Sequence, residues 1–317
     1  MPTGQVWSVN TLGGYHAVPY LSDKLRSVAQ PMYRLRQFVD VKEAIGKGRG
    51  EAWLFDKTGN VQSAGGVLVE TNTIPETQFI TNQGTGSITE YGNSIPYTAK
   101  MNTLGQFALE PMVEQKLRDD MVKVLESACG AQYVATEYVG VCVGTASTAI
   151  TTNGTATATA TADLTASNVR GFVDFFKKRN VPKYDGRNYI CVASTAALAG
   201  MHADTGTGGW IDISKYSDTY ARNIFEGEVG TFYGVKFIEE TGYLSNTIGS
   251  GSTHGQAVLF GSDNVYEAVS VPEEIRVKNS TDYGRDQGLA WYALLGWKKV
   301  WDYAVDGEQH IMFITSA

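Results

Sequence analysis

The residue types that carry out enzyme chemistry are few and widely spaced in this sequence. The four histidines belong to no HExxH sequence and to no other close metal-ligand spacing; they are His16, His202, His254 and His310. The sequence has no GxSxG nucleophile elbow, no Walker loop and no GxGxxG turn before a helix. We therefore predict no catalytic site, no metal and no cofactor, and hence a protein that is not an enzyme.

Adjacent carboxylates occur at three places, Asp119-Asp120, Glu239-Glu240 and Glu273-Glu274. Neighbours on a helix point about 100° apart, and neighbours on a strand point to opposite faces. None of these pairs can therefore share a proton as a catalytic acid and base do, and we interpret them as solvated charges.

The composition is that of a folded globular chain, because 43% of the 317 residues are hydrophobic and 19% are charged. The net charge of −7 argues against a protein held to nucleic acid by a basic surface. The three cysteines, Cys129, Cys142 and Cys191, are too few for a disulfide framework, and Cys129 and Cys191 are expected to be buried. We also expect no signal peptide and no membrane span, since no apolar run is long enough.

Residues 51–100 read as a segment that cannot fold alone. Short β-prone runs at 52–55, 66–69, 78–81 and 87–91 are separated by turn residues such as glycine and asparagine. Each run has few large apolar side chains, so the segment cannot bury a core of its own. We expect it to be an arm that lies on a neighbouring subunit.

Contact with a second subunit would involve the larger side chains of this segment. The candidate interface residues in it are Trp53, Phe55, Val67, Val69, Glu70, Ile74, Phe79 and Tyr91. Arg285 is a further candidate, in a loop that precedes an aromatic strand. A subunit contact or a structural ion pair explains this arginine better than an active site does.

A long amphipathic helix is predicted from Gln106 to Gln132. Apolar residues recur in steps of three and four, as at Leu109, Val113 and Leu117, so they form one continuous stripe. The chain after it alternates helices and strands from residue 166 to 269, which indicates an α/β block. Thr165 or Ser167 is expected to cap the first helix of this block, and further helices are predicted at 22–36, 194–201 and 216–225.

The remaining predicted elements are mostly strands. We expect them at 138–143, 189–193, 235–238, 257–260, 265–269, 274–278, 289–301 and 309–315. The Thr/Ala tract from Thr145 to Ala166 has period two and no large apolar residue, so an extended hairpin or loop is predicted there, turning at Asn153-Gly154.

Five segments carry a family resemblance: Ser87–Thr98, Leu104–Gln132, Leu164–Ala193, Phe225–Thr241 and Ser280–Trp297. Their order, spacing and total length together resemble the major capsid (coat) protein of tailed bacteriophages. The last segment, STDYGRDQGLAWYALLGW, is similar to the closing strands of a podovirus-like group. The resemblance implies an α+β fold of the Johnson type, with an extended β-hairpin (the E-loop), a long spine helix with a peripheral β domain, and an α/β axial domain.

The domain boundaries that the resemblance implies run along the chain in five pieces. Residues 1–50 would be an N-terminal arm and 51–101 the E-loop. Residues 102–165 would hold the spine helix, part of the peripheral domain and a variable Thr/Ala loop. Residues 166–269 would form the axial domain, and 270–317 the closing strands of the peripheral domain.

The implied function is that of a major capsid protein. Its copies would form hexamers and pentamers of an icosahedral shell around the double-stranded DNA genome, contacted non-specifically. The implied location is the virion, with assembly in the host cytoplasm and no membrane partner. A separate scaffolding protein and a portal are expected partners, and the resemblance allows for a decoration protein.

Some family members cross-link subunits through a Lys–Asn isopeptide bond. Lys57 is the lysine inside the arm. The sequence gives no reason to place an asparagine and a catalytic glutamate opposite it, so we predict no cross-link between subunits.

Two other interpretations remain open from the sequence. An encapsulin-like nanocompartment shell shares the fold and would hold a cargo enzyme instead of DNA. An α/β enzyme built on residues 166–269 is a more distant alternative, because that block contains no nucleophile or metal set.

Overall fold

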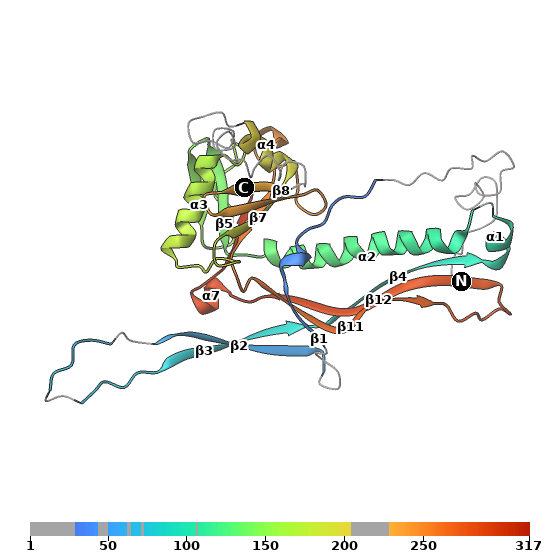
Figure 1. Ribbon diagram of the computed structural model, residues 1–317, viewed down its shortest axis with the longest axis horizontal. Helices are drawn as coiled ribbons and strands as arrows, with labels where there is room; N and C mark the ends of the chain where they lie inside the picture. Colours follow the sequence, from blue (N-terminus) through green and yellow to red (C-terminus); the bar gives the residue numbers. More distant parts are fainter. Residues whose placement is uncertain (1–28, 44–49, 62–64, 71–72, 106, 204–227) are drawn as a thin grey trace.

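The computed structural model describes residues 29–43, 50–61, 65–70, 73–105, 107–203 and 228–317. Its named strands form three sheets, in the orders β1-β11-β12-β4, β6-β5-β13-β10-β7-β9-β8 and β2-β3 (Figure 1). The predicted helix at 216–225 and residues 22–28 of the one predicted at 22–36 lie outside the described residues. The described remainder of the latter, 29–36, is wrong as an α-helix, because residues 29–35 have no helical structure and only a 3-10 turn begins at Arg36. In the described part of the chain, no helix is both long and apolar enough to cross a membrane.

The four-stranded sheet carries the long helix along one face (Figure 1). Its strands are β1 (Asp40–Glu43), β11 (Val265–Val277), β12 (Asp286–Lys299) and β4 (Thr89–Thr98). A short helix, α1 (Ala99–Leu104), follows β4, and the Thr98 side chain accepts a hydrogen bond from the Met101 amide at its start.

The long helix α2 (Leu109–Val134) confirms the predicted stripe of apolar residues. Leu109, Val113 and Leu117 are buried against the sheet, as the helical spacing requires. The helix is also tied to the sheet by a polar contact, because Trp291 on β12 donates its indole N–H to Asp120 at 3.0 Å. One hydrophobic core therefore joins α2, β4 and β12.

A second hydrophobic core lies between one face of the seven-stranded sheet and two helices. Its strands are β5 (Tyr138–Gly144), β6 (Ser147–Thr151), β7 (Tyr189–Ser194), β8 (Glu228–Phe232), β9 (Val235–Glu240), β10 (Ala257–Phe260) and β13 (Ile311–Ile314). The helices are α3 (Ala166–Lys178) and α4 (Thr195–Ala203). Thr165 caps α3 by accepting a hydrogen bond from the Asn168 amide, which selects between the two predicted caps.

The pairing of the strands crosses two of the predicted domain boundaries. β13 lies between β5 and β10, so strands from the predicted pieces 102–165 and 270–317 complete the sheet of the piece 166–269. β11 starts at Val265 and belongs to the four-stranded sheet, where it continues through two register shifts as a single strand. Partners in a sheet are set by tertiary packing and not by local sequence, and the domain boundaries stay a prediction.

The segment before the arm ties the four-stranded sheet to α2. It holds a short 3-10 turn, η2 (Arg36–Phe38), and leads into β1. The Arg36 guanidinium pairs with Glu267 at 2.5 Å and also with Glu273, while the Arg36 amide donates to Glu126 on α2 at 3.1 Å. Two further short elements are η3 (Ser250–Ser252) and α7 (Tyr303–Asp306).

The two-stranded sheet projects from the body as a long hairpin (Figure 1). Its strands are β2 (Ala52–Val61) and β3 (Phe79–Ser87), and we call residues 52–87 the arm. The predicted strand at 66–69 is not formed, since residues 65–69 have no regular secondary structure. The segment predicted to have few large apolar side chains is thus a hairpin that ends in an irregular loop.

Candidate assembly interface

The outer part of the arm exposes large apolar side chains to solvent. We call residues 65–70 and 73–81 the tip. Six of its apolar side chains are at least 44% exposed: Val67, Leu68, Val69, Ile74, Phe79 and Ile80. Val67 is 100% exposed. A contiguous set of exposed apolar residues of this kind marks an interaction surface in a folded protein.

The inner part of the arm has the opposite character. We call residues 52–57 and 82–87 the root. Trp53 is only 3% exposed, and its ring centre lies 4.9 Å from that of Tyr266 on β11. Phe55 completes the stack at 5.6 Å from Tyr266. The root is therefore held to its own subunit by three aromatic rings.

Two glycines make this aromatic stack fit. Gly84 and Gly86 lie directly across the hairpin from Phe55 and Trp53. A side chain at either glycine would overlap the facing ring. The aromatic rings thus cover cross-strand glycines, which compensates for the poor packing of glycine in a strand.

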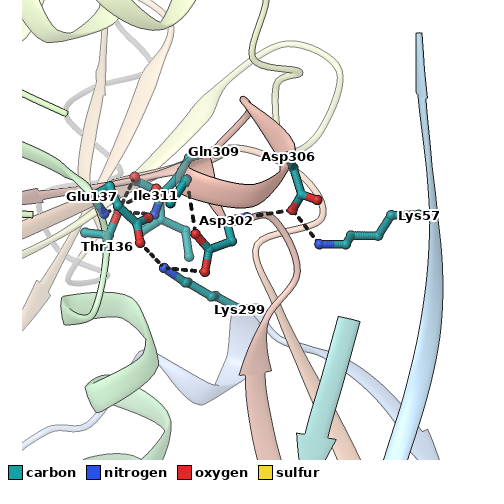
Figure 2. Close-up of polar contacts among 9 residues, drawn as sticks. Lys57, Thr136, Glu137, Lys299, Asp302, Asp306, Gln309 and Ile311 are labelled. Atoms are coloured by element: carbon teal, nitrogen blue, oxygen red, sulfur yellow. Dashed lines mark hydrogen bonds and ion pairs between the residues drawn. The ribbon is translucent and has the colours of Figure 1, made fainter. Parts of the chain in front are cut away.

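A buried ion pair fixes the root at a second point. The Lys57 ammonium pairs with the Asp306 carboxylate on α7, and the two side chains are 6% and 2% exposed (Figure 2). Asn82 donates from its amide nitrogen to the other oxygen of Asp306 at 2.9 Å. Burial alone would raise the pKa of Asp306, but the hydrogen bonds from Lys57, the Asp302 amide and Asn82 hold it below its usual value.

The turn that carries Asp306 is itself anchored at the junction of the two large sheets. Lys299, at the end of β12, pairs with Glu137 at 2.6 Å and with Asp302 at 3.4 Å (Figure 2). Thr136 donates to the Ile311 carbonyl at 2.8 Å, just where β13 begins. The root of the arm therefore contacts a turn that also joins the four-stranded and seven-stranded sheets.

The candidate contact residues divide between these environments. Val67, Val69, Glu70, Ile74 and Phe79 lie in the exposed tip. Nothing in a single subunit tests whether they contact a second one, so that role stays a prediction.

Trp53 is buried in its own chain, so little of its side chain is exposed to a second subunit, and its predicted contact stays a prediction. Phe55 is half-buried in the same stack, and Tyr91 packs on Trp297 with ring centres 5.7 Å apart. Arg285 has a side chain that is 81% exposed and lies 3.5 Å from Asp282, as an exposed ion pair would.

Sequence reasoning placed no asparagine and no acidic residue beside Lys57. The structure supplies one of each from the same chain. Asn82 is its cross-strand neighbour, and Asp306 is 249 positions away in sequence. The register of a hairpin could have indicated the asparagine, but no local signal indicates the aspartate. Asp306 pairs with this lysine within one chain, and the absence of a cross-link between subunits stays a prediction.

Outside the arm, the cysteines and histidines that could carry out catalysis are buried or lie apart from one another. All three cysteines are buried and free, and desolvation raises the pKa of Cys142 to about 12. His254 contacts Asp163 at 2.7 Å, and His310 contacts the Ser262 carbonyl. Within the described ranges, no three histidine, cysteine or acidic side chains are grouped as metal ligands would be.

The comparisons with known proteins give matches at the level of structure. No family model matches the sequence, and no curated protein does. The capsid of Ralstonia phage GP4 is 16% identical, with a TM-score of 0.64 over 98% of each chain. The acidic stable capsid of Helicobacter pylori bacteriophage KHP30 is 12% identical, with a TM-score of 0.65 over 93% of this chain and 94% of that one. A chain of Mycobacterium phage Che8 is 12% identical, with a TM-score of 0.63 over 94% of this chain and 96% of that one.

These matches extend over nearly the whole length of the chains on both sides, so they concern the complete arrangement of sheets, helix and arm and not one common motif. The α+β fold of this protein is the phage major capsid fold.

Proposed function

We propose that this protein is the major capsid protein of a tailed phage, and that its copies assemble as hexamers and pentamers into an icosahedral shell around double-stranded DNA. The observation that carries the proposal is the exposed tip of the arm on a chain with the phage capsid fold. A lone subunit gains nothing from exposing the six apolar side chains of the tip, whereas a neighbour could cover them.

The physical demands of a shell support the proposal. Obligate interfaces bury roughly 2,000–5,000 Å² and are richer in apolar area than other surfaces. A projecting arm offers such area at little cost in chain length, because both of its faces can be covered. In this proposal, α2 with the four-stranded sheet is the peripheral domain, and the seven-stranded sheet with α3 and α4 is the axial domain.

The partners follow from the same proposal. A separate scaffolding protein would guide assembly, a portal would occupy one vertex, and a decoration protein could bind the outer surface. Packaged DNA would be contacted non-specifically, in keeping with the net charge of −7. Assembly would take place in the host cytoplasm. The nanocompartment alternative is not favoured, because the matched structures reported above are phage structures.

Electron microscopy of particles made by co-expression with the phage's own scaffolding protein tests the proposal. The wild-type chain should give closed icosahedral shells. Deleting residues 65–78 should abolish them while leaving the circular dichroism of the subunit unchanged. This deletion spares the pair between Val61 and Phe79, so the remaining hairpin can still close.

A matched variant separates the side chains of the tip from its length. Replacing residues 65–78 by the same number of glycine and serine residues keeps the reach of the arm but removes its apolar surface. This variant should also fail to form shells. Normal shells from the deletion variant would contradict the proposed role of the arm, and absence of shells from the wild-type chain would contradict the proposed function.

A further inference from the structure

One stretch of the chain has a charge opposite to that of the whole. Residues 166–188, which hold α3 and the loop that leads to β7, contain six basic and two acidic residues in a chain whose net charge is −7. We propose that basic side chains in the later half of this stretch form the surface with which the protein contacts the phosphate backbone of packaged double-stranded DNA. The inference rests on the proposed function, and it adds the place of the DNA contact to it.

The turn between β8 and β9 brings these basic residues together. Tyr233 and Gly234 have positive φ angles of 50° and 77°, as a tight hairpin turn requires. The Lys177 ammonium lies 4.0 Å from the centre of the Tyr233 ring. The Lys183 ammonium and the Arg187 carbonyl oxygen lie 4.0 Å and 3.9 Å from the point where a side chain of Gly234 would begin. Lys177, Lys183 and Arg187 therefore meet at one turn, and we call them, with Tyr233, the basic patch.

The carboxylates of the same stretch neutralise the basic patch only in part. Lys177 pairs with Asp174 at 3.7 Å, but the two side chains are 44% and 50% exposed, and a pair of this kind is worth little in water. Asp185 accepts hydrogen bonds from two backbone amides of its own loop. Among the described residues, no carboxylate forms an ion pair with Lys183 or Arg187. These charges are therefore available to a partner.

The surroundings of the patch favour a phosphate backbone over an acidic protein as the partner. Between residues 166 and 188, all of which the structure describes, no large apolar side chain is exposed. Tyr233 is 43% exposed, and its hydroxyl donates to Asp174 at 3.1 Å. A protein interface needs an apolar core, whereas contacts to phosphate need only positive charge and hydrogen-bond donors. The helix dipole explains a cation at Lys177 but none beyond the end of α3.

A contact of this size is weak in one copy and adds up over a shell. Three cations that neutralise three phosphates give a slope of about −3 when the logarithm of the binding constant is plotted against that of the salt concentration. Many copies that face one DNA molecule bind it together much more strongly than any copy does alone. The remainder of the chain is acidic and repels DNA, so the contact is confined to the patch.

Binding of a short fluorescent DNA duplex to the dissociated full-length chain tests the surface. At low salt, Lys177→Glu/Lys183→Glu should weaken binding about tenfold or more, and it should reduce the magnitude of the salt slope by about two. The milder variant Lys177→Gln/Lys183→Gln should have an intermediate effect. Thermal melting of both variants checks that the subunit is folded. A wild-type chain that does not bind the duplex would overturn the inference.

The matched control is Lys100→Glu/Lys123→Glu, which makes the same change in net charge at two exposed lysines on α1 and α2. It should weaken binding much less than the patch variant does. Equal losses from the two double variants would overturn the inference, because net charge alone would then explain the binding. Tighter binding of polyglutamate than of the duplex would also overturn it, in favour of an acidic protein partner.

Acetylation of lysine side chains, read by mass spectrometry, tests the contact in assembled particles. Lys177 and Lys183 should react more slowly in DNA-filled particles than in the same particles after their DNA has been released. Equal rates in the two kinds of particle would overturn the inference and leave the proposed function standing. Failure of the wild-type chain to form closed shells would instead remove the proposed function, and this inference with it.

Discussion

The root and the tip of the arm belong to one hairpin, but their side chains meet opposite surroundings. The root buries Trp53 at 3% exposure, whereas the tip leaves Val67 at 100%. The root is fixed by contacts to residues more than two hundred positions away, and the described tip residues rest on no such partners. Buried and exposed apolar side chains are thus divided between the two ends of one hairpin.

This division has a physical reason. An arm that reached a neighbour from a loose attachment would lose conformational entropy at its root on binding, and that loss would weaken the contact. Because the ring stack and the buried ion pair already fix the root, only the tip has to be ordered. Changes in the root should therefore affect the folding of the subunit, and changes in the tip should affect only assembly.

The largest expected effect on stability comes from removing the Trp53 ring from the aromatic stack of the root. Trp53→Ala should lower the free energy of unfolding of the dissociated subunit by about 3–5 kcal/mol, the usual cost of removing a buried tryptophan. Trp291→Ala, in the core under α2, should cost a similar amount. Chemical denaturation measures both, and unchanged stability of the Trp53 variant would show that the root is not packed as described.

Breaking the buried ion pair should have the next largest effect. Lys57→Met leaves the Asp306 carboxylate buried without its cation, which should cost about 3 kcal/mol. Asp306→Leu added to Lys57→Met should restore part of the loss, since an apolar pair has no charge to desolvate. If the double variant were as unstable as the sum of the two singles, the two residues would not act as a pair.

Acid should weaken the same attachment. The folded pKa of Asp306 is lowered, so this carboxylate contributes stability above the ordinary carboxyl pKa of about 3.8 and loses that contribution as the pH falls below it. The difference in stability between wild type and Lys57→Met should therefore shrink as the pH is lowered below about 3.8. A constant difference across this range would exclude Asp306 as the titrating partner.

The smallest effect on folding should come from the tip. Val67→Ser and Phe79→Ser should each change the stability of the subunit by less than about 0.5 kcal/mol, because the side chains are already in water. The yield of particles should nevertheless fall. A tip variant that melts earlier but assembles normally would reverse the comparison between root and tip.

Local elements were predictable from the sequence because their signals are local. The stripe from Leu109 fixed the long helix to within three residues at each end, and the Thr165 cap marked the start of α3. The alternation and turn residues of segment 51–100 also indicated an arm with too little apolar content to fold alone. These signals depend on residues only a few positions apart.

Contacts between distant parts of the chain could not be predicted from the sequence. Nothing near Trp53 in sequence indicates Tyr266 as its neighbour, and nothing near Lys57 indicates Asp306. The place of β13 is of the same kind, since a strand at Ile311–Ile314 carries no signal that its neighbours are β5 and β10. The exposure of the tip also comes from the structure alone, in which its six apolar side chains are at least 44% exposed.

The late position of β13 in a central slot has a consequence for synthesis. Until residues 311–314 leave the ribosome, β5 and β10 each present an unpaired edge, and the hairpin of β5 and β6 has no attachment to the rest of its sheet. A nascent chain therefore exposes unpaired strand edges until β13 has been made, and such edges favour mispairing and aggregation.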